Sequence, residues 1–157
     1  MRRITQCVTG GVGLVVLAAT GGVIKAQTPA PPAAPAAPSA PSASKVFAFD
    51  QMPAKKSPNG TESRSVPGFT LTTGEAVGMH ESVQPPGITP VALHPIHHSE
   101  LILIQEGSLL FEHDGKQEKA GAGDMVYVAE GTTHRITNIG TGPAKYFVVQ
   151  VGGDTKK

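Results

Sequence analysis

The sequence predicts an all-β domain, a small sandwich or barrel, in the C-terminal two thirds of the chain. Residues 45–152 contain short runs rich in β-branched and aromatic residues, which favour strands. Turn-forming residues separate nearly all of these runs, and the chain has 19 Gly and 14 Pro. No stretch repeats apolar residues at helical spacing between capping residues. Many short strands at regular spacing indicate a sandwich or barrel rather than a helical bundle.

The individual strands are predicted at the apolar runs, in chain order. These runs are VFAF (46–49), FTLTTG (69–74), LILIQ (101–105), SLLFEH (108–113), MVYVA (125–129), HRITN (134–138) and KYFVVQV (145–151). The sequence HDGK at 113–116 places Asp-Gly between two extended runs. This dipeptide favours the positive φ angles of a type I′ turn, so a tight hairpin is predicted there.

The N-terminal segment 1–26 has the features of a secretory signal peptide. Arg2 and Arg3 precede an uncharged apolar stretch at 4–24, and a small-residue cleavage site ends at Ala26. The alternative is an uncleaved anchor, because the uncharged stretch is long enough to span a bilayer. With cleavage we expect a periplasmic or secreted protein without stable membrane association. Cleavage would also remove Cys7, the single cysteine, so a hydrophobic core must stabilise the domain without disulfides.

The next segment, residues 27–44, contains almost only Ala, Pro and Ser. It cannot bury enough surface to fold, so we predict a disordered and extended Ala/Pro linker. The folded domain is then expected at 45–152, followed by a short tail at 153–157. The formal net charge of +1 gives no reason to expect a nucleic-acid partner.

A cluster of histidines in HPIHHSE (94–100) is the strongest candidate for chemistry. In an extended strand, His94, His98 and Glu100 share one face. Two imidazoles and a carboxylate on one face can bind a divalent metal ion, because both kinds of ligand bind such ions at about 2 Å. His134 opens a later apolar run and is the best-placed further ligand. The alternative is an exposed polar turn that binds nothing.

Two motifs in this region resemble those of the cupin superfamily. The first motif is His-x-His, three residues, Glu, six residues and Gly; here His94, Glu100 and Gly107 occupy the first, third and last of these places. The second motif fits at every spacing, with alanine where proline is usual. It reads Gly123-DMVYV-Ala129-Glu130-Gly131-TT-His134-RIT-Asn138. The resemblance extends over essentially the whole folded domain and implies a cupin-type jelly-roll β-barrel.

The resemblance also implies one divalent transition metal, which could be iron, manganese, zinc, nickel or copper, held by three histidines and one glutamate. Ile96 stands where the second histidine of the first motif is expected. His98 is the candidate replacement, and His97 is its rival. If neither replaces the missing ligand, two histidines and the glutamate remain, or the site is empty. The predicted ligand set is His94, His98, Glu100 and His134.

For function, the resemblance implies that a small organic molecule binds in the barrel beside the metal. A metal-dependent oxygenase or isomerase is one possibility, and a non-catalytic ligand-binding protein with a degenerate site is the other. No catalytic residue can be named from the sequence. A homodimer is expected because proteins of this family often pair through edge strands.

The surroundings of the site are predicted from the strand residues nearby. We expect apolar walls from Leu101, Leu103, Phe111, Val126 and Val128. We expect Gln105 and Tyr127 at the pocket rim or in packing, and His80 and His113 at the surface or behind the ligands.

Overall fold

The computed structural model describes residues 44–155, so the predicted signal peptide and almost all of the predicted linker lie outside the described residues. Within this range the chain forms strands and one short 3-10 helix, without an α-helix, which confirms the all-β prediction. The elements are η1 (Phe49–Gln51), β1 (Lys55–Lys56), β2 (Glu62–Thr70), β3 (Ala76–Gln84), β4 (His94–Pro95), β5 (Ser99–Glu106), β6 (Ser108–His113), β7 (Lys116–Gly121), β8 (Met125–Val128), β9 (Thr133–Asn138) and β10 (Ala144–Val151). No helix between residues 44 and 155 is long and apolar enough to cross a membrane.

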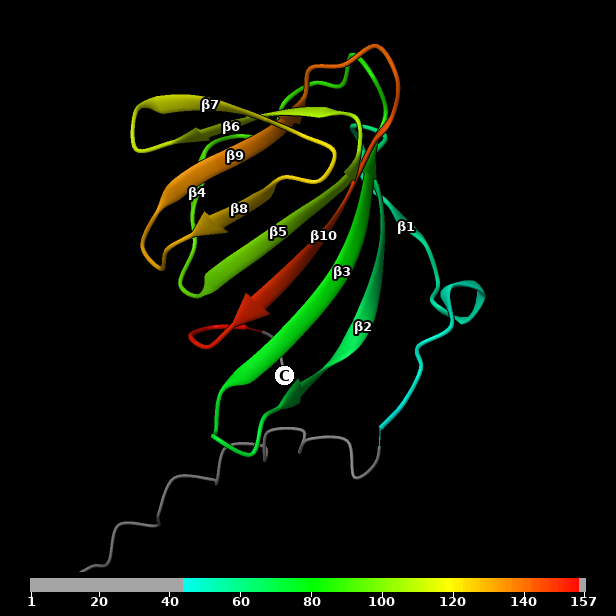
Figure 1. Cartoon of the computed structure of the whole chain (residues 1–157), viewed down its shortest axis with the longest axis vertical. Helices are drawn as coiled ribbons and strands as arrows, with labels where there is room; N and C mark the ends of the chain where they lie inside the picture. Colours follow the sequence, from blue (N-terminus) through cyan, green and yellow to red (C-terminus); the bar gives the residue numbers. More distant parts are fainter. Residues whose placement is uncertain (1–43, 156–157) are drawn as a thin grey trace, which may run out of the picture. The chain divides into compact units, whose positions relative to one another are not determined.

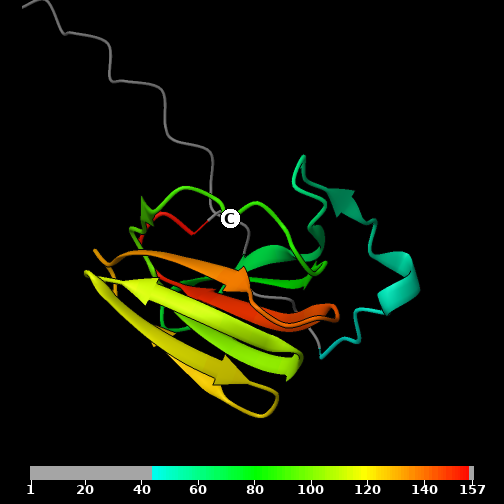
Figure 2. The ribbon, with the colours of Figure 1, turned by 90° about the horizontal axis from the view of Figure 1, so that it is seen from above.

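The strands form two antiparallel sheets (Figure 1). The larger sheet has the order β1-β2-β3-β10-β5-β8, and the smaller has the order β4-β9-β6-β7. The two sheets lie as layers when the molecule is seen from above (Figure 2). Strand β10 pairs with both β3 and β5, so segments distant in the sequence lie side by side. This is the crossing pattern of a jelly roll, as predicted.

The core lies between the two sheets, and strand β5 shows how the sequence fills it. Glu100, Ile102 and Ile104 are buried, while Leu101 and Leu103 are 46% and 39% exposed. The expectation that both leucines wall the cavity is therefore wrong. Side chains alternate along a strand, so the inward position of Glu100 places the two leucines on the outer face.

The other predicted wall residues lie on the inner side of the barrel. Phe111 and Val128 are buried in the core cluster, and Val126 is partly buried against it. The largest fully buried side chains are Ile102, Leu109 and Val128. The apolar core thus joins β5 and β8 of the larger sheet to β6 of the smaller one.

The hairpin between β6 and β7 confirms the prediction made from Asp-Gly. The strands pair from Ser108 opposite Gly121 to His113 opposite Lys116, leaving a two-residue loop. Asp114 and Gly115 have φ angles of 45° and 76°, as a type I′ turn requires. This local signal was sufficient because two-residue hairpins tolerate few other dipeptides.

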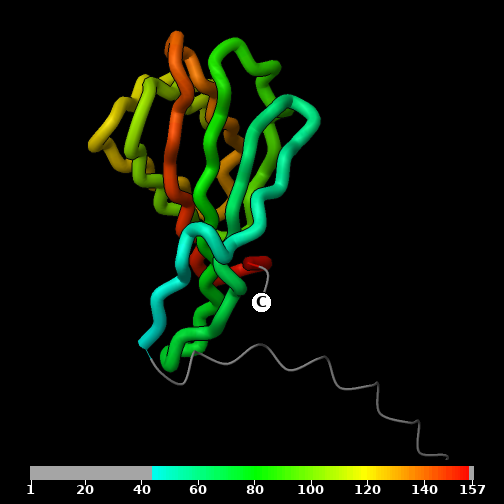
Figure 3. The backbone as a smooth tube through the Cα atoms, turned by 90° about the vertical axis from the view of Figure 1, so that its right-hand side faces the viewer, coloured from blue at the N-terminus to red at the C-terminus, as the bar shows by residue number. Residues whose placement is uncertain are grey.

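The predicted strand at 46–49 is wrong. Residues 44–48 have no regular structure, and η1 follows them. Phe47 and Phe49 instead lie over the outer face of the larger sheet, beside residues of β2, β3 and β10. Figure 3 views the side of the molecule on which this segment lies, with the segment in cyan. The run stays largely exposed, with Val46 and Phe49 at 86% and 51%. A short apolar run can lie against a sheet without joining it, and periodicity alone does not distinguish it from a strand.

Candidate functional site

A cavity of about 280 Å³ opens inside the barrel and contains most of the predicted site. Strands of both sheets and the loops before β2 and β4 contribute to its wall. The lining residues are Ser57, Asn59, Thr61, His80, Gln84, Val91, His94, Glu100, Ile102, His134, Ile136, Tyr146, Val148 and Gln150. Histidine, amide, hydroxyl and carboxylate groups dominate this wall, so the cavity suits a small polar molecule.

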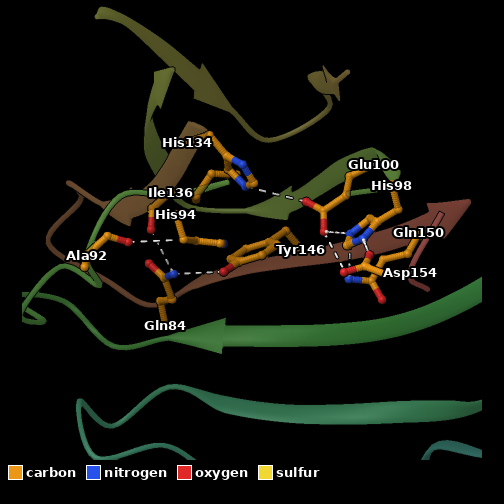
Figure 4. Close-up of polar contacts among 10 residues, drawn as sticks. All are labelled: Gln84, Ala92, His94, His98, Glu100, His134, Ile136, Tyr146, Gln150 and Asp154. Carbon is orange, nitrogen blue, oxygen red and sulfur yellow. Dashed lines mark hydrogen bonds and ion pairs between the residues drawn. The ribbon is translucent and has the colours of Figure 1, made fainter. Parts of the chain in front are cut away.

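Three of the four predicted ligands line this cavity together. His94 on β4 is the direct cross-strand partner of His134 on β9, and their ring centres are 4.9 Å apart. Glu100 on β5 reaches them from the other sheet, with its Oε2 atom 3.6 Å from Nε2 of His134 (Figure 4). Glu100 and His134 are only 7% and 5% exposed. The sequence motifs therefore bring two imidazoles and one carboxylate to the same cavity wall.

The second ring nitrogens of these histidines differ in their surroundings. Nδ1 of His94 lies 3.2 Å from the carbonyl oxygen of Ala92. In the tautomer that carries its proton on Nδ1, the ring donates to this oxygen and Nε2 is the atom with the free lone pair. Nδ1 of His134 is buried, and among the described residues it makes no hydrogen bond of standard geometry, although the His134 ring interacts with the backbone of Thr132. A buried polar atom that lacks a well-formed hydrogen bond costs stability.

Position 96, where the first motif lacks its histidine, belongs to the core. Ile96 is 4% exposed and packs in the apolar cluster between the sheets. The chain bends at residues 97 and 98, so the segment 94–100 is not one continuous strand. His97 is exposed and does not line the cavity. Because of this bend, the direction of the His98 side chain cannot be predicted from the alternation of side chains along a strand.

His98 binds the carboxylate of Glu100 from the side away from His134. Its Nε2 atom is 2.9 Å from Oε1 of Glu100, whereas His134 faces Oε2. Its Nδ1 atom is 2.7 Å from Oδ1 of Asp154 (Figure 4). Gln150 adds a hydrogen bond from its amide nitrogen to Oε1 of Glu100 at 3.1 Å. The structure therefore places His98 beside Glu100 but not on the face of the carboxylate that His134 approaches.

The histidines around Glu100 have pKa shifts of opposite sign. Burial lowers the pKa of His98, but hydrogen bonds to Asp154 and Glu100 outweigh burial and leave the pKa raised. Burial lowers the pKa of His134, although the Glu100 carboxylate opposes this. His134 is therefore expected to resist protonation and to keep the neutral form that binds metals, whereas His98 should keep its proton to a higher pH than a free histidine does.

Sequence reasoning missed the role of His80. This residue was expected at the surface or behind the ligands, but it lines the cavity from β3 together with His94, Glu100 and His134. Burial lowers its pKa, and the Glu100 carboxylate opposes the shift. The alternation of His80, Ser82 and Gln84 along β3 was a signal that could have found it, because three polar residues on one strand face can line a cavity.

A hydrogen-bonded group around Gln84, also not predicted from the sequence, contributes to the cavity wall. Gln84 donates a hydrogen bond to the hydroxyl oxygen of Tyr146 at 2.8 Å and accepts one from the backbone N–H of Asn138 at 2.8 Å. Asn138, the last residue of the second motif, donates in turn to the Gln84 carbonyl at 3.0 Å. These bonds connect the two sheets and fix the amide and the phenol at the wall.

Two residues expected near the rim lie elsewhere. Tyr127 is 63% exposed on the outer face, and Gln105 is also exposed. His113 stacks on Phe111 with ring centres 4.4 Å apart and does not line the cavity. The strand register therefore separates these side chains from the site.

The donor set in the cavity is compatible with a divalent transition metal. Imidazole nitrogen and carboxylate oxygen are suitable ligands for iron, manganese, zinc, nickel and copper. Two ligands that each bind one ion at about 2 Å lie roughly 3 Å apart, somewhat closer than the 3.6 Å between His134 and Glu100. Between residues 44 and 155, no group of three or more His, Cys, Asp or Glu side chains is close enough to hold an ion as the side chains stand. Binding would therefore require the donor side chains to move closer together.

Comparison with known proteins agrees with the architecture. The family model of the cupin domain matches residues 79–150. KdgF from Halomonas sp. superposes with a TM-score of 0.58 at 12% identity, covering 69% of this chain and 94% of that one. An RmlC-like cupin from Shewanella frigidimarina superposes with a TM-score of 0.55 at 16% identity, covering 69% and 91%. A predicted oxalate decarboxylase from Thermotoga maritima has a TM-score of 0.53 at 22% identity, covering 68% and 98%. At these identities the likeness shows the fold alone, and a search of curated proteins found no match.

Proposed function

The chain belongs to the cupin superfamily, and from this premise we propose that its barrel binds one divalent transition metal and, beside it, a small polar organic molecule. The observation that supports the proposal most directly is the convergence of His94, Glu100 and His134 on one cavity wall. The metal would supply Lewis acidity or, if redox-active, electron transfer. The neighbouring side chains would bind and orient the molecule.

The cavity wall indicates the class of ligand. Gln84, Gln150, Tyr146 and His80 offer hydrogen-bond donors and acceptors, and between residues 44 and 155 no Lys or Arg lines the cavity. A phosphorylated ligand would lack the cationic partners that phosphate usually requires. We therefore propose a hydroxylated or carboxylic molecule smaller than a typical drug, since the cavity is about 280 Å³.

The reaction class follows from which proton carriers face the cavity. His80 has a lowered pKa and lines the wall near Glu100, so it can accept a proton from a bound molecule at neutral pH. Tyr146 has its pKa raised by burial and therefore stays protonated as a donor. A base and a donor in one cavity suit proton transfer, as in an isomerisation. We propose a metal-dependent enzyme of the isomerase or oxygenase type.

A second candidate function is ligand binding without turnover. It is favoured by Ile96, whose buried side chain replaces a ligand of the family motif and leaves the donor set one imidazole short. Such a protein would be stabilised by its ligand without forming a product. The two functions share the cavity and differ only in turnover.

Metal analysis of the purified protein, prepared without a polyhistidine tag, tests the proposed site. We expect about one metal ion per chain in the wild type and a loss of most of it in His134→Ala, because that variant removes a cavity-facing donor. His97→Ala is the matched control, since His97 belongs to the same cluster but is exposed and outside the cavity. Metal-free wild-type protein that also takes up no iron, manganese, zinc, nickel or copper on titration would contradict the proposal.

Two further features of the protein are proposed on other grounds. We propose delivery to the periplasm or secretion, because residues 1–26 have the order of parts of a signal peptide. N-terminal sequencing of the protein from cell fractions tests this, and a cytoplasmic protein that retains residue 1 would contradict it. We also propose a homodimer, since Leu101, Leu103, Met125 and Tyr127 form an exposed apolar row on the outer sheet face.

A further inference from the structure

The chain makes a sharp turn directly after β10 and packs against the histidine cluster. Gly152 and Gly153 have φ angles of 75° and 52°. The backbone N–H of Asp154 donates to the carbonyl oxygen of His97 at 3.0 Å, and that of Gly152 donates to Ala76 at 2.8 Å. Although a tail was expected at 153–157, residues 153–155 thus form part of the folded structure, and Thr155 is only 4% exposed.

Gly153 is required for this close approach. A Cβ atom at this position would collide with the carbonyl oxygen of His97, and the positive φ angle already disfavours other residues. The turn and the bend at His97–His98 are therefore in direct backbone contact. This contact places the Asp154 side chain beside the His98 ring.

The side chains of Asp154, His98 and Glu100 form a chain of hydrogen bonds that leads from this backbone contact to the cavity. Oδ1 of Asp154 lies 2.7 Å from Nδ1 of His98, and Nε2 of His98 lies 2.9 Å from Oε1 of Glu100 (Figure 4). The Gln150 amide also donates to Oε1. Two donors therefore occupy one oxygen of Glu100, and the other oxygen, Oε2, faces His134 across 3.6 Å.

We propose that Asp154 is a positioning residue of the site: it holds His98, and His98 holds the Glu100 carboxylate with Oε2 directed at the cavity. This inference rests on the proposed metal site, and it assigns His98 and Asp154 to orienting a ligand rather than to binding the ion. A carboxylate that must swing freely between rotamers loses affinity for an ion, whereas a fixed one is ready to bind. Glu100 would then contribute only its Oε2 atom to binding of the ion.

The solvent exposure of Asp154 distinguishes a role in positioning Glu100 from a role in stabilising the fold. Its side chain is 58% exposed, whereas the side chains of His98 and Glu100 are 11% and 9% exposed. An ion pair with one exposed partner contributes little to global stability. Loss of Asp154 should therefore change the geometry at Glu100 and metal binding far more than it changes the melting temperature.

The first test is a crystal structure of the metal-free Asp154→Ala chain beside the wild type. We expect the His98 ring to leave its position and the Glu100 carboxylate to adopt more than one rotamer. An unchanged contact between His98 and Oε1 of Glu100 overturns the inference. This readout does not depend on metal, so it judges the positioning role even if the wild type binds no metal and the proposed function fails.

The second test is a titration of the full chain with Co²⁺, followed by its visible absorption spectrum. Asp154→Ala should weaken Co²⁺ binding about tenfold to a hundredfold. In a His98→Gln background, the same substitution should have no further effect, because its route through the imidazole is gone. Equal losses in both backgrounds would show that Asp154 does not act through His98, and unchanged affinity in the wild-type background would also overturn the inference.

A third variant tests the turn itself. Gly153→Ala retains Asp154 but displaces the backbone that carries it, so it should weaken Co²⁺ binding as Asp154→Ala does. Gly74→Ala is the matched control, because Gly74 also has a positive φ, 103°, but its added Cβ would meet no atom within 4 Å. Gly153→Ala that binds Co²⁺ as tightly as Gly74→Ala would contradict the proposed role of the turn.

Discussion

Two histidines that interact with Glu100 respond to pH in opposite directions. His80 is buried on the cavity wall and has a lowered pKa, because burial disfavours its charged form. His98 is also penalised by burial, but its two carboxylate partners raise its pKa. Glu100 thus interacts with one imidazole that resists protonation and with another that favours it. The pH dependence of stability should separate them.

Replacing His80 by Gln should remove an acid-sensitive part of the stability. An unfolded histidine binds a proton below about pH 6.5, whereas folded His80 binds one only at lower pH. The unfolded state therefore holds more protons in this window, and the free energy of unfolding falls as the pH falls through it. Urea unfolding of the metal-free protein at several pH values measures this. We expect the decline below pH 6.5 to be shallower in His80→Gln.

His98→Gln is the control, because this substitution should change the pH dependence of stability in the opposite direction. Because the folded pKa of His98 is raised, its contribution is complete below about pH 6.5 and is lost as the pH rises through the folded value. The stability difference between wild type and His98→Gln should therefore shrink from acidic to alkaline pH. If both variants changed the pH profile in the same direction, the assignment of the two environments would be wrong.

Single residues also show what the sequence could not reveal about the site. The resemblance to the cupin motifs implied that His94, Glu100 and His134 meet inside a barrel, and all three line one cavity. The partner of His98 could not be predicted, since Asp154 lies 56 positions away and reaches it only through the pairing of β10 with β5. Contacts between distant segments depend on strand order, and local patterns do not encode it.

Among the elements, the turn between β5 and β6 also has a restrictive geometry. Gly107, the last residue of the first motif, has a φ of 86°. A Cβ atom there would lie 2.7 Å from both Cα of Ala144 and the carbonyl oxygen of Pro143. Both neighbours are backbone atoms, which cannot move as a side chain can. The motif glycine is therefore required by packing of this turn against the start of β10.

Gly107→Ala should consequently destabilise the domain by about 2–5 kcal/mol, from the strained φ angle and the overlap together. The comparison is Gly87→Ala, which has a positive φ of 67° and no atom within 4 Å of the added Cβ. That control should cost only about 1 kcal/mol. Urea unfolding of the two variants measures the difference. Equal losses would show that the contact with Ala144 and Pro143 is unimportant.

The elements were predictable where a local signal specifies them. The β6–β7 hairpin followed from Asp114 and Gly115, and the apolar runs marked most strands of the core. Residues 46–49 have the same composition as a strand, but Phe47 and Phe49 lie over the outer sheet face and the segment joins no strand. Val46 and Phe49 remain 86% and 51% exposed. Composition therefore predicts neither the burial nor the hydrogen-bond partners of such a run.

At the scale of the whole molecule, one face of the larger sheet has an unusual surface. Leu101 lies opposite Tyr127 and Leu103 opposite Met125 on β5 and β8. Met125 and Tyr127 are 75% and 63% exposed. In the described part of the chain β8 is an edge strand of its sheet, so its outer backbone groups are free to pair. An apolar row beside an open edge is typical of an interface between protein chains.

The proposed homodimer therefore makes a prediction about this row. Tyr127→Glu should dissociate the dimer, because two copies of a charge would be buried near the two-fold axis without partners. Light scattering after size-exclusion chromatography at micromolar concentrations measures the molar mass. We expect a dimer for the wild type and a monomer for the variant. The same substitution at Ile139, which is 43% exposed in the loop between β9 and β10, should leave the dimer intact. A wild-type chain that elutes as a monomer would remove the basis for pairing, and the row would then need a different partner.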